Sequence, residues 1–144
     1  MKRLLLAPLL ISLSFLTSGF ISKKSNIKEL FCEGAIDLSL LVDIKTGQRY
    51  RRMEEVFDEK PSNTIIPFDK RIETSKFIME SSSSLKSGLF TSQSSRTFLS
   101  NGVVRDIFIE VNFNDMSGKM IIDSSYVHIP YKRIPTTIFK KCEF

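Results

Sequence analysis

Hydrophobic and polar residues alternate most regularly in the segment Arg105–Asn114, where every second position is apolar. A period of two is the pattern of a strand that buries one face. The stretch Asp115–Gly118 then carries a glycine suited to a turn, and apolar positions recur through Lys119–Val127. We therefore predict a β-hairpin over these residues.

Several segments before residue 105 also have the pattern of β-strands, although apolar and polar positions alternate less regularly there. The stretch Tyr50–Phe57 fits a helix or a polar-edged strand equally well, and the apolar stretch Thr64–Phe68 is broken by Pro67. Turn residues occur at Lys45–Gln48 and Asn101–Gly102. The predicted strands are Leu30–Gly34, Ile36–Ile44, Arg71–Glu80 and Arg96–Leu99.

Two serine-rich stretches, Ser81–Ser84 and Thr91–Ser95, contain no charged residue. Such composition is typical of flexible connections, so we predict loops there. The stretch Leu85–Thr91 between them is predicted to hold one short strand.

The C-terminal part contains Pro130 and Pro135, which confine the chain to an edge strand or a connection. We predict a last strand within Thr136–Phe144. Strands joined by short loops, without long amphipathic helices, predict a mainly β protein: a single antiparallel sheet domain of about six to eight strands, arranged as a sandwich or a partly open barrel.

The N-terminus carries Lys2 and Arg3 ahead of an uncharged apolar run, which ends at the small residues Thr17-Ser18-Gly19. These are the parts of a secretory signal peptide. We predict a signal peptide over residues 1–19, a flexible lead-in over 20–28 and the antiparallel β domain over 29–144, in the periplasm or outside the cell. The alternative is an uncleaved membrane anchor, but the run is slightly shorter than the ~20 residues that a spanning helix needs.

The chain has two cysteines, Cys32 and Cys142, which bracket nearly all of the predicted domain. In an oxidising compartment an even pair favours a disulfide, which would pin the last strand to the first. Two free thiols are the alternative. A zinc site is not supported, because two distant cysteines and a single histidine match no familiar ligand spacing.

The net charge of the chain is +5, from 21 basic and 16 acidic residues. The basic residues fall in short clusters, which we interpret as solvated faces. A nucleic-acid interface would need a longer basic stripe with interleaved aromatics, so we expect no nucleic-acid partner. The clusters are Lys23-Lys24, Arg49-Arg51-Arg52, Lys132-Arg133 and Lys140-Lys141.

Catalytic chemistry finds little support. No serine lies in a Gly-x-Ser-x-Gly turn, and the only histidine, His128, ends a predicted strand. The carboxylate pairs Glu54-Glu55 and Asp58-Glu59 are adjacent on a charged segment, whereas acid–base catalysis needs two carboxylates in one cleft with different environments. We predict no catalytic, cofactor-binding or metal-binding residues, no cofactor and no enzymatic activity.

Three short features occur together in this chain: Cys32-Glu33-Gly34 on an early strand, the turn Asn114-Asp115-Met116-Ser117-Gly118, and the ending Cys142-Glu143-Phe144. With the leader, this layout resembles small uncharacterised secreted proteins of marine cyanobacteria. The resemblance implies a β fold and an exported location, and it implies no activity.

These observations favour a small exported, non-enzymatic binding protein, expected to be a monomer. Its ligand could be a small apolar molecule held by phenylalanine and isoleucine side chains. The alternative is a structural or adhesion module that contacts anionic envelope polymers through its basic edges. An enzyme with an unrecognised site is a third hypothesis.

Overall fold

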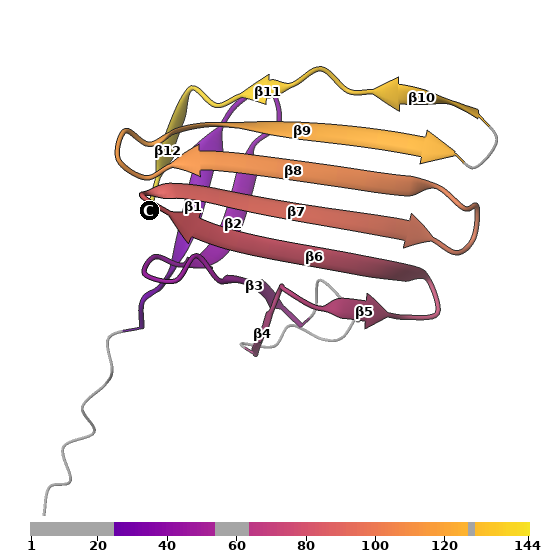
Figure 1. The fold of residues 1–144 in the computed structure, drawn as a ribbon, viewed down its shortest axis with the longest axis horizontal. Coiled ribbons are helices and arrows are strands. Elements are labelled where there is room, and N and C mark those ends of the chain that lie inside the picture. Colours follow the sequence, from indigo (N-terminus) through magenta and orange to yellow (C-terminus); the bar gives the residue numbers. More distant parts are fainter. Residues whose placement is uncertain (1–24, 54–63, 127–128) are drawn as a thin grey trace, which may run out of the picture.

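The computed structural model describes residues 25–53, 64–126 and 129–144, which form two antiparallel sheets (Figure 1). One sheet has five strands in the order β12-β1-β2-β3-β4, and the other has seven in the order β10-β9-β8-β7-β6-β5, with β11 paired to β9. The strands are β1 (Ile27–Glu33), β2 (Leu38–Asp43), β3 (Arg49–Arg52), β4 (Ile65–Pro67), β5 (Arg71–Glu73), β6 (Phe77–Lys86), β7 (Leu89–Phe98), β8 (Val104–Asn112), β9 (Ser117–Tyr126), β10 (Ile129–Arg133), β11 (Thr137–Ile138) and β12 (Lys141–Glu143). The prediction of a mainly β, antiparallel fold is confirmed, and the two separate sheets are consistent with the sandwich alternative.

The two sheets cross one another. In Figure 1 the long strands β6 to β9 run across the view, and β1, β2 and β12 pass behind their left-hand half at a steep angle. The chain moves from the five-stranded sheet to the seven-stranded sheet at residues 68–70, between β4 and β5, and returns between β11 and β12. In the view of Figure 1, β1, β2 and β12 therefore overlap only one end of the longer sheet, and β3 and β4 of the same five-stranded sheet appear below β6.

The predicted hairpin is present as β8 and β9. Ile107 pairs with Ile122 and Ile109 with Met120, so the apolar positions of both strands share one face. At the turn, the Asp115 carboxylate accepts hydrogen bonds from the backbone N–H and the hydroxyl of Ser117. Strict alternation and a local turn were enough to predict this element.

The loop prediction for the serine-rich stretches is wrong, because both lie within β6 and β7. These strands pair without a break from Phe77 opposite Phe98 to Lys86 opposite Leu89, and the predicted strand Leu85–Thr91 is instead the hairpin turn. Ser87 and Gly88 adopt the positive φ angles of 50° and 79° there. Serine has little intrinsic preference for strands, but these central strands pair on both sides, and tertiary context overrides a weak propensity.

Two further predicted strands are each divided in the structure. Arg71–Glu80 contains a turn, at which the Thr74 hydroxyl accepts hydrogen bonds from the Lys76 and Phe77 N–H groups, so β5 and β6 are separate. Thr136–Phe144 places β11 in one sheet and β12 in the other. Neither segment contains a glycine or a proline, so the turn residues used for the prediction gave no signal where the chain changes direction.

The remaining strand predictions agree in part. Strand β3 agrees with the strand alternative, rather than the helix alternative, for the first part of Tyr50–Phe57. Residues 54–57 lie outside the described part. Pro130 lies in β10 at the edge of its sheet, as predicted. The twelve described strands exceed the predicted number because several contain only two or three residues.

The main core lies where the sheets overlap. Leu30, Leu40 and Val42 come from the five-stranded sheet and pack in one cluster with Phe90 and Val111 of the other. All five are at most 4% exposed. Full burial of such a side chain stabilises the fold by roughly 1.5–3 kcal/mol, so this cluster is the principal contact holding the sheets together.

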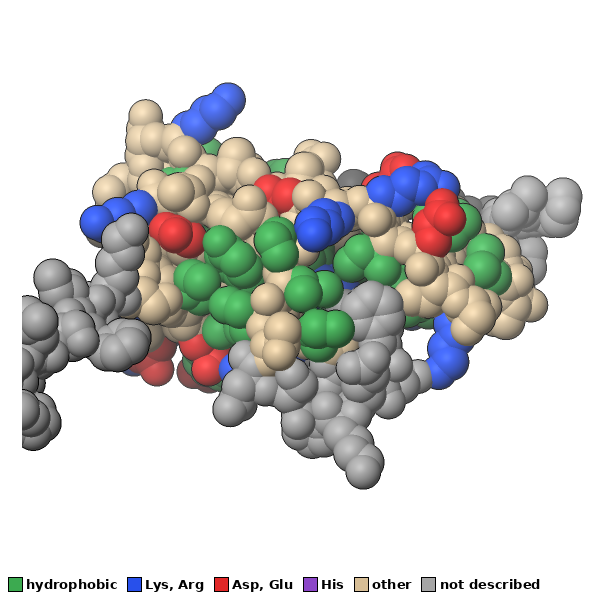
Figure 2. Space-filling model, turned by 90° about the horizontal axis from the view of Figure 1, so that it is seen from below, with side chains coloured by type: hydrophobic (Ala, Val, Ile, Leu, Met, Phe, Trp, Pro, Cys, Tyr) green, Lys and Arg blue, Asp and Glu red, His purple; other side chains and the backbone are tan. Residues whose placement is uncertain are grey.

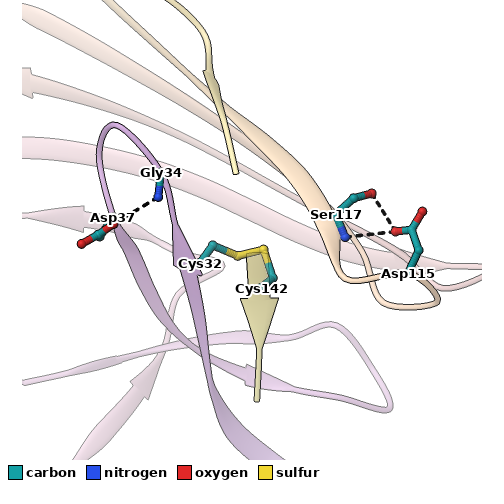
Figure 3. The surroundings of a disulfide bond; sticks show 6 residues. All are labelled: Cys32, Gly34, Asp37, Asp115, Ser117 and Cys142. Atoms are coloured by element: carbon teal, nitrogen blue, oxygen red, sulfur yellow. Dashed lines mark hydrogen bonds between the residues drawn. A yellow bond between two sulfur atoms is a disulfide. The ribbon is translucent and has the colours of Figure 1, made fainter. Parts of the chain in front are cut away.

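A disulfide joins Cys32 to Cys142, which confirms the predicted bond (Figure 3). The two residues are directly opposite in the β1–β12 pairing, with their Cα atoms 4.1 Å apart, and both side chains are buried. The Cys142 N–H also donates to the Met116 carbonyl in the β8–β9 turn. The bond therefore ties the short last strand to the first across a separation of 110 residues.

The N-terminal predictions fall mostly outside the described part. Residues 1–24 are not described, so the signal peptide and its cleavage remain predictions. Strand β1 begins at Ile27, within the predicted lead-in. Among the described residues there is no helix with the length and apolar character required to span a membrane.

Candidate functional site

The inner face of the β6–β7 hairpin has a polar middle between two apolar ends. Phe77 and Phe98 form one end, and Leu85 and Phe90 form the other. Between them the register places Ser81 opposite Ser94 and Ser83 opposite Ser92, on the same face as these apolar residues. The serine-rich stretches therefore supply a patch of hydroxyl groups inside the sandwich.

Strand β3 of the other sheet faces this polar patch. The Arg49 N–H donates to the Ser83 hydroxyl at 3.1 Å, and its guanidinium donates to the buried Ser92 hydroxyl at 3.1 Å. The Ser83 hydroxyl in turn donates to the Asp69 carboxylate at 2.8 Å. Polar bonds of this kind connect the two sheets where their apolar core ends.

Two arginines of β3 stack against one buried ring. The guanidinium carbons of Arg49 and Arg51 lie 3.8 and 4.2 Å from the centre of the Phe68 ring, which is fully buried at the crossing between β4 and β5. Cation–π contacts contribute roughly 0.5–2 kcal/mol each, depending on desolvation. The interpretation of the Arg49-Arg51-Arg52 cluster as a solvated face is wrong for Arg51, which is only 9% exposed, because strand alternation turns positions 49 and 51 inward.

A second pair of arginines comes from the opposite sheet. Arg96 on β7 and Arg105 on β8 are direct cross-strand partners. Arg96 lies 4.5 Å from the Phe77 ring centre and Arg105 lies 5.7 Å from that of Phe98. Neither arginine forms an ion pair with a carboxylate of the described residues.

The electrostatics of this pair are unfavourable. Burial lowers the pKa of Arg96 below the ordinary arginine value, and the positive charge of Arg105 lowers it further. By contrast, hydrogen bonds to Glu73 and Glu80 raise the pKa of Arg71, an exposed arginine at the edge of the same sheet. Like charges placed directly opposite one another across two strands destabilise a sheet.

These four arginines border one hollow between the sheets, which we call the arginine pocket. Arg49, Arg51, Arg96 and Arg105 line it together with Ser94, and its volume is about 150 Å³. Among the described residues, the rest of the lining is apolar and consists of Leu38, Ile107, Ile109 and Met120. The pocket therefore combines a cationic wall with a hydrophobic wall, and none of the described residues that line it is a carboxylate.

A larger hollow, of about 470 Å³, lies on the outer face of the seven-stranded sheet. Phe108 and Ile121 line it together with Gln93 and several serines, and Glu80, Asp106 and Asp123 add carboxylates. Asp106 and Asp123 are direct cross-strand partners. This hollow is acidic where the arginine pocket is basic, so the two faces of the sheet differ in charge.

Hydrophobic side chains also gather on the side of the molecule where β4 and β5 are the outer strands (Figure 2). Ile66 of β4 packs there against Ile72, Phe77 and Met79, which form a second, smaller core. These contacts account for apolar residues near this edge through packing, and we assign no site to it.

The predicted chemistry can be compared with the described residues. His128 and the pairs Glu54-Glu55 and Asp58-Glu59 lie outside them. No three histidine, cysteine or acidic side chains come together as a metal site within the part of the chain that the structure describes. Both cysteines are in the disulfide and are unavailable as ligands.

Sequence reasoning missed the arginine pocket, although two signals pointed to it. The spacing Arg49-x-Arg51 in an extended segment puts both side chains on one face. The turn dipeptide Asn101–Gly102 also indicated a hairpin that brings Arg96 near Arg105, and in the structure the two arginines are cross-strand partners. What the sequence did not show was that the two pairs face each other across the sheets.

No protein-family model, curated protein or solved structure matches this chain. The candidate function must therefore be argued from the geometry of the arginine pocket alone.

Proposed function

We propose that this chain is an exported, non-enzymatic binding protein that holds an anionic ligand in the arginine pocket. The observation that carries the proposal is the convergence of four guanidinium groups from both sheets on one hollow. Partly buried charges are normally paired, because removing a charge from water costs several kcal/mol or more without a partner. An anion would supply that partner for Arg96, which is partly buried, and would also offset the positive charge of its exposed cross-strand neighbour Arg105.

The volume of the arginine pocket argues against the apolar-ligand hypothesis. About 150 Å³ is below the roughly 300–1,000 Å³ of pockets that enclose a drug-sized molecule. The cationic wall would also penalise a purely apolar occupant, since the guanidinium groups would lose water without gaining a partner. A small anion meets both constraints.

The hypothesis of a basic edge that contacts envelope polymers receives less support. Lys141 lies 2.6 Å from Glu143, and Lys140 lies 3.9 Å from Glu33. The cluster Lys140-Lys141 therefore has carboxylates beside it, and the local charge available to a polymer is small.

Export is part of the proposal and rests on two observations. Residues 1–19 have the pattern of a signal peptide. The buried disulfide belongs to proteins of oxidising compartments. Fractionation of the producing cell, followed by intact-mass measurement, should find a chain shortened by the leader outside the cytoplasm. The full-length chain in the cytosol, with both thiols free, would contradict export.

Ligand binding is tested by thermal unfolding in benzoate, sulfate and phosphate, with chloride adjusting the ionic strength to a constant value. A bound anion should raise the unfolding temperature by roughly 10 °C at a hundredfold excess over its dissociation constant. The double variant Arg96→Gln/Arg105→Gln should lose this response. The matched control Arg71→Gln, which removes an exposed arginine of the same sheet, should keep it.

Two results would reject the binding proposal. One is that none of the three anions raises the unfolding temperature. The other is that the pocket variant and the Arg71→Gln control respond equally, which would mean that the anions act by general screening and exclusion from the surface.

A further inference from the structure

The arginine pocket is two-sided, and this restricts the chemistry of its ligand. Its cationic wall comes from β3 in one sheet and from β7 and β8 in the other. Its apolar wall, which includes Ile107 and Ile109 of β8, continues toward the main core. A ligand that satisfies both walls carries its charge at one end and hydrocarbon at the other.

The cross-strand pair Arg96 and Arg105, neither of which forms an ion pair with a carboxylate of the described residues, favours a ligand with more than one negative charge. Arg96 and Arg105 face each other as cross-strand partners, and Arg49 and Arg51 approach from the opposite sheet. A carboxylate offers two oxygens and one charge. A phosphate monoester offers three terminal oxygens and close to two charges near neutral pH, and guanidinium groups bind it in the same bidentate way.

The size of the pocket limits what the charged group is attached to. Protein cavities of about 150 Å³ hold a molecule the size of benzene. The hollow therefore accepts a hydrocarbon group no larger than one benzene ring against its apolar wall, with the phosphate held at the guanidinium groups that border it. A nucleotide or a long sugar phosphate would extend well beyond it.

We propose that the ligand of this site is a phosphate monoester attached to a small hydrocarbon group. This inference rests on the proposed anion-binding function and specifies its substrate class. The same chemistry occurs in soluble organic phosphates and in the headgroup of phosphatidic acid, and the experiment separates these two sources.

The first measurement is calorimetric titration of the protein with phenyl phosphate, benzenesulfonate and inorganic phosphate. At about pH 7.5, phenyl phosphate should bind at least tenfold more tightly than benzenesulfonate, which has the same ring but one charge. It should also bind more tightly than inorganic phosphate, which lacks the ring. Vesicles with and without phosphatidic acid form a further arm, in which sedimentation of the protein reports binding to the lipid source.

The pH dependence provides an independent readout. Phenyl phosphate loses its second charge below a pKa of about 6, so its affinity should fall roughly tenfold between pH 7.5 and pH 5, while that of benzenesulfonate should not change. Among the described residues, the charged groups that line the pocket are Arg49, Arg51, Arg96 and Arg105. Among carboxylates on the neighbouring elements, Asp69 accepts from Ser83, and Glu80, Asp106 and Asp123 line the outer hollow.

Variants assign the effect to the two walls. Arg105→Gln should weaken phenyl phosphate by roughly tenfold to a hundredfold, because it removes one charge-assisted contact, and Arg71→Gln should not. Ile107→Ser should weaken phenyl phosphate and leave inorganic phosphate unchanged. Circular dichroism and the unfolding temperature of each variant establish that it is folded.

The outcomes separate the two proposals. If benzenesulfonate or benzoate binds as tightly as phenyl phosphate, the phosphate inference is overturned and the anion site stands. If inorganic phosphate matches phenyl phosphate, the hydrocarbon part of the inference is overturned. If no probe binds, the anion site itself fails. Binding to phosphatidic acid vesicles, lost in Arg105→Gln, supports the inference and identifies a lipid source.

Discussion

Reduction of the disulfide should remove a large share of the stability of this domain. The Cys32–Cys142 bond closes a loop of 110 residues. In the chain-entropy description, a loop of that length stabilises the folded state by roughly 4–5 kcal/mol, because it restricts the unfolded chain. Small domains have about 5–15 kcal/mol in total. The reduced protein should therefore be marginally stable at best.

The structure supplies a competing effect that would make the loss smaller. Strand β12 contains three residues at the edge of its sheet and pairs only with β1. Without the bond, this strand could separate locally while the rest of the sandwich persists, since edge elements open at a lower free energy than the core. Two backbone bonds, from Lys140 N–H to the Glu33 carbonyl and from Cys142 N–H to the Met116 carbonyl, oppose that separation.

The assay is urea denaturation with and without a phosphine reductant, followed by circular dichroism. A domain of this size has a denaturant slope of about 2 kcal/mol/M, so reduction should lower the midpoint by roughly 2 M. The same atoms pack in both forms, apart from two added protons, so the comparison isolates the cross-link. Hydrogen exchange of the Cys142 amide reports on local separation of β12.

The double variant Cys32→Ala/Cys142→Ala is the matching genetic test. It should lose the cross-link and also some packing, because both sulfurs are buried. A reduced midpoint within about 0.5 M of the oxidised one, with the Cys142 amide still protected, would refute the argument that the loop is restricted mainly in the unfolded state.

Three further predictions test local features. Phe68→Leu should destabilise the fold by about 2–3 kcal/mol, because its ring is fully buried and stacks with two guanidinium groups; a loss below about 1 kcal/mol in urea denaturation would show that these stacks contribute nothing. Gly47→Ala should cost at least roughly 1–3 kcal/mol, since this residue has a φ of 74° and a Cβ there would lie 2.5 Å from the Leu85 backbone nitrogen; an unchanged unfolding midpoint would contradict the turn. Hydrogen bonds from Ser117 lower the pKa of Asp115, so the ionised carboxylate stabilises the fold at pH values above its unfolded pKa and loses that effect as the pH falls through its lower folded pKa. The difference in urea midpoint between wild type and Asp115→Asn should therefore shrink toward low pH. A difference that stays constant with pH would refute this role of Asp115.

Local patterns predicted the elements whose structure depends on neighbouring residues. Strict alternation and the Asp115–Gly118 turn located the β8–β9 hairpin, and Asn101–Gly102 located the turn before it. The disulfide was also predictable, because the chain offers a single pair of cysteines. These features need no knowledge of how the sheets pack.

The serine-rich strands and the arginine pocket depended on contacts between distant segments. Ser81–Ser84 and Thr91–Ser95 form strands because each pairs along its whole length with neighbours in the sheet. Arg51 is buried because the Phe68 ring lies against it. The residues near position 51 in the sequence do not indicate that contact. Composition therefore gave the wrong prediction for both features, because in each case it indicated exposed and loosely structured residues.

The sequence by itself determined a β fold, the turns at Lys45–Gln48, Asn101–Gly102 and Asp115–Gly118, and the cross-link between Cys32 and Cys142, because alternation and turn chemistry act over a few residues. Only the tertiary structure decided that the chain forms two crossed sheets and that β3 lies opposite the β7–β8 hairpin. Burial and charge at the arginine pocket result from that crossing. They depend on contacts between distant residues, such as that between Arg49 and Ser92, which are 43 positions apart, and no local pattern specifies such contacts.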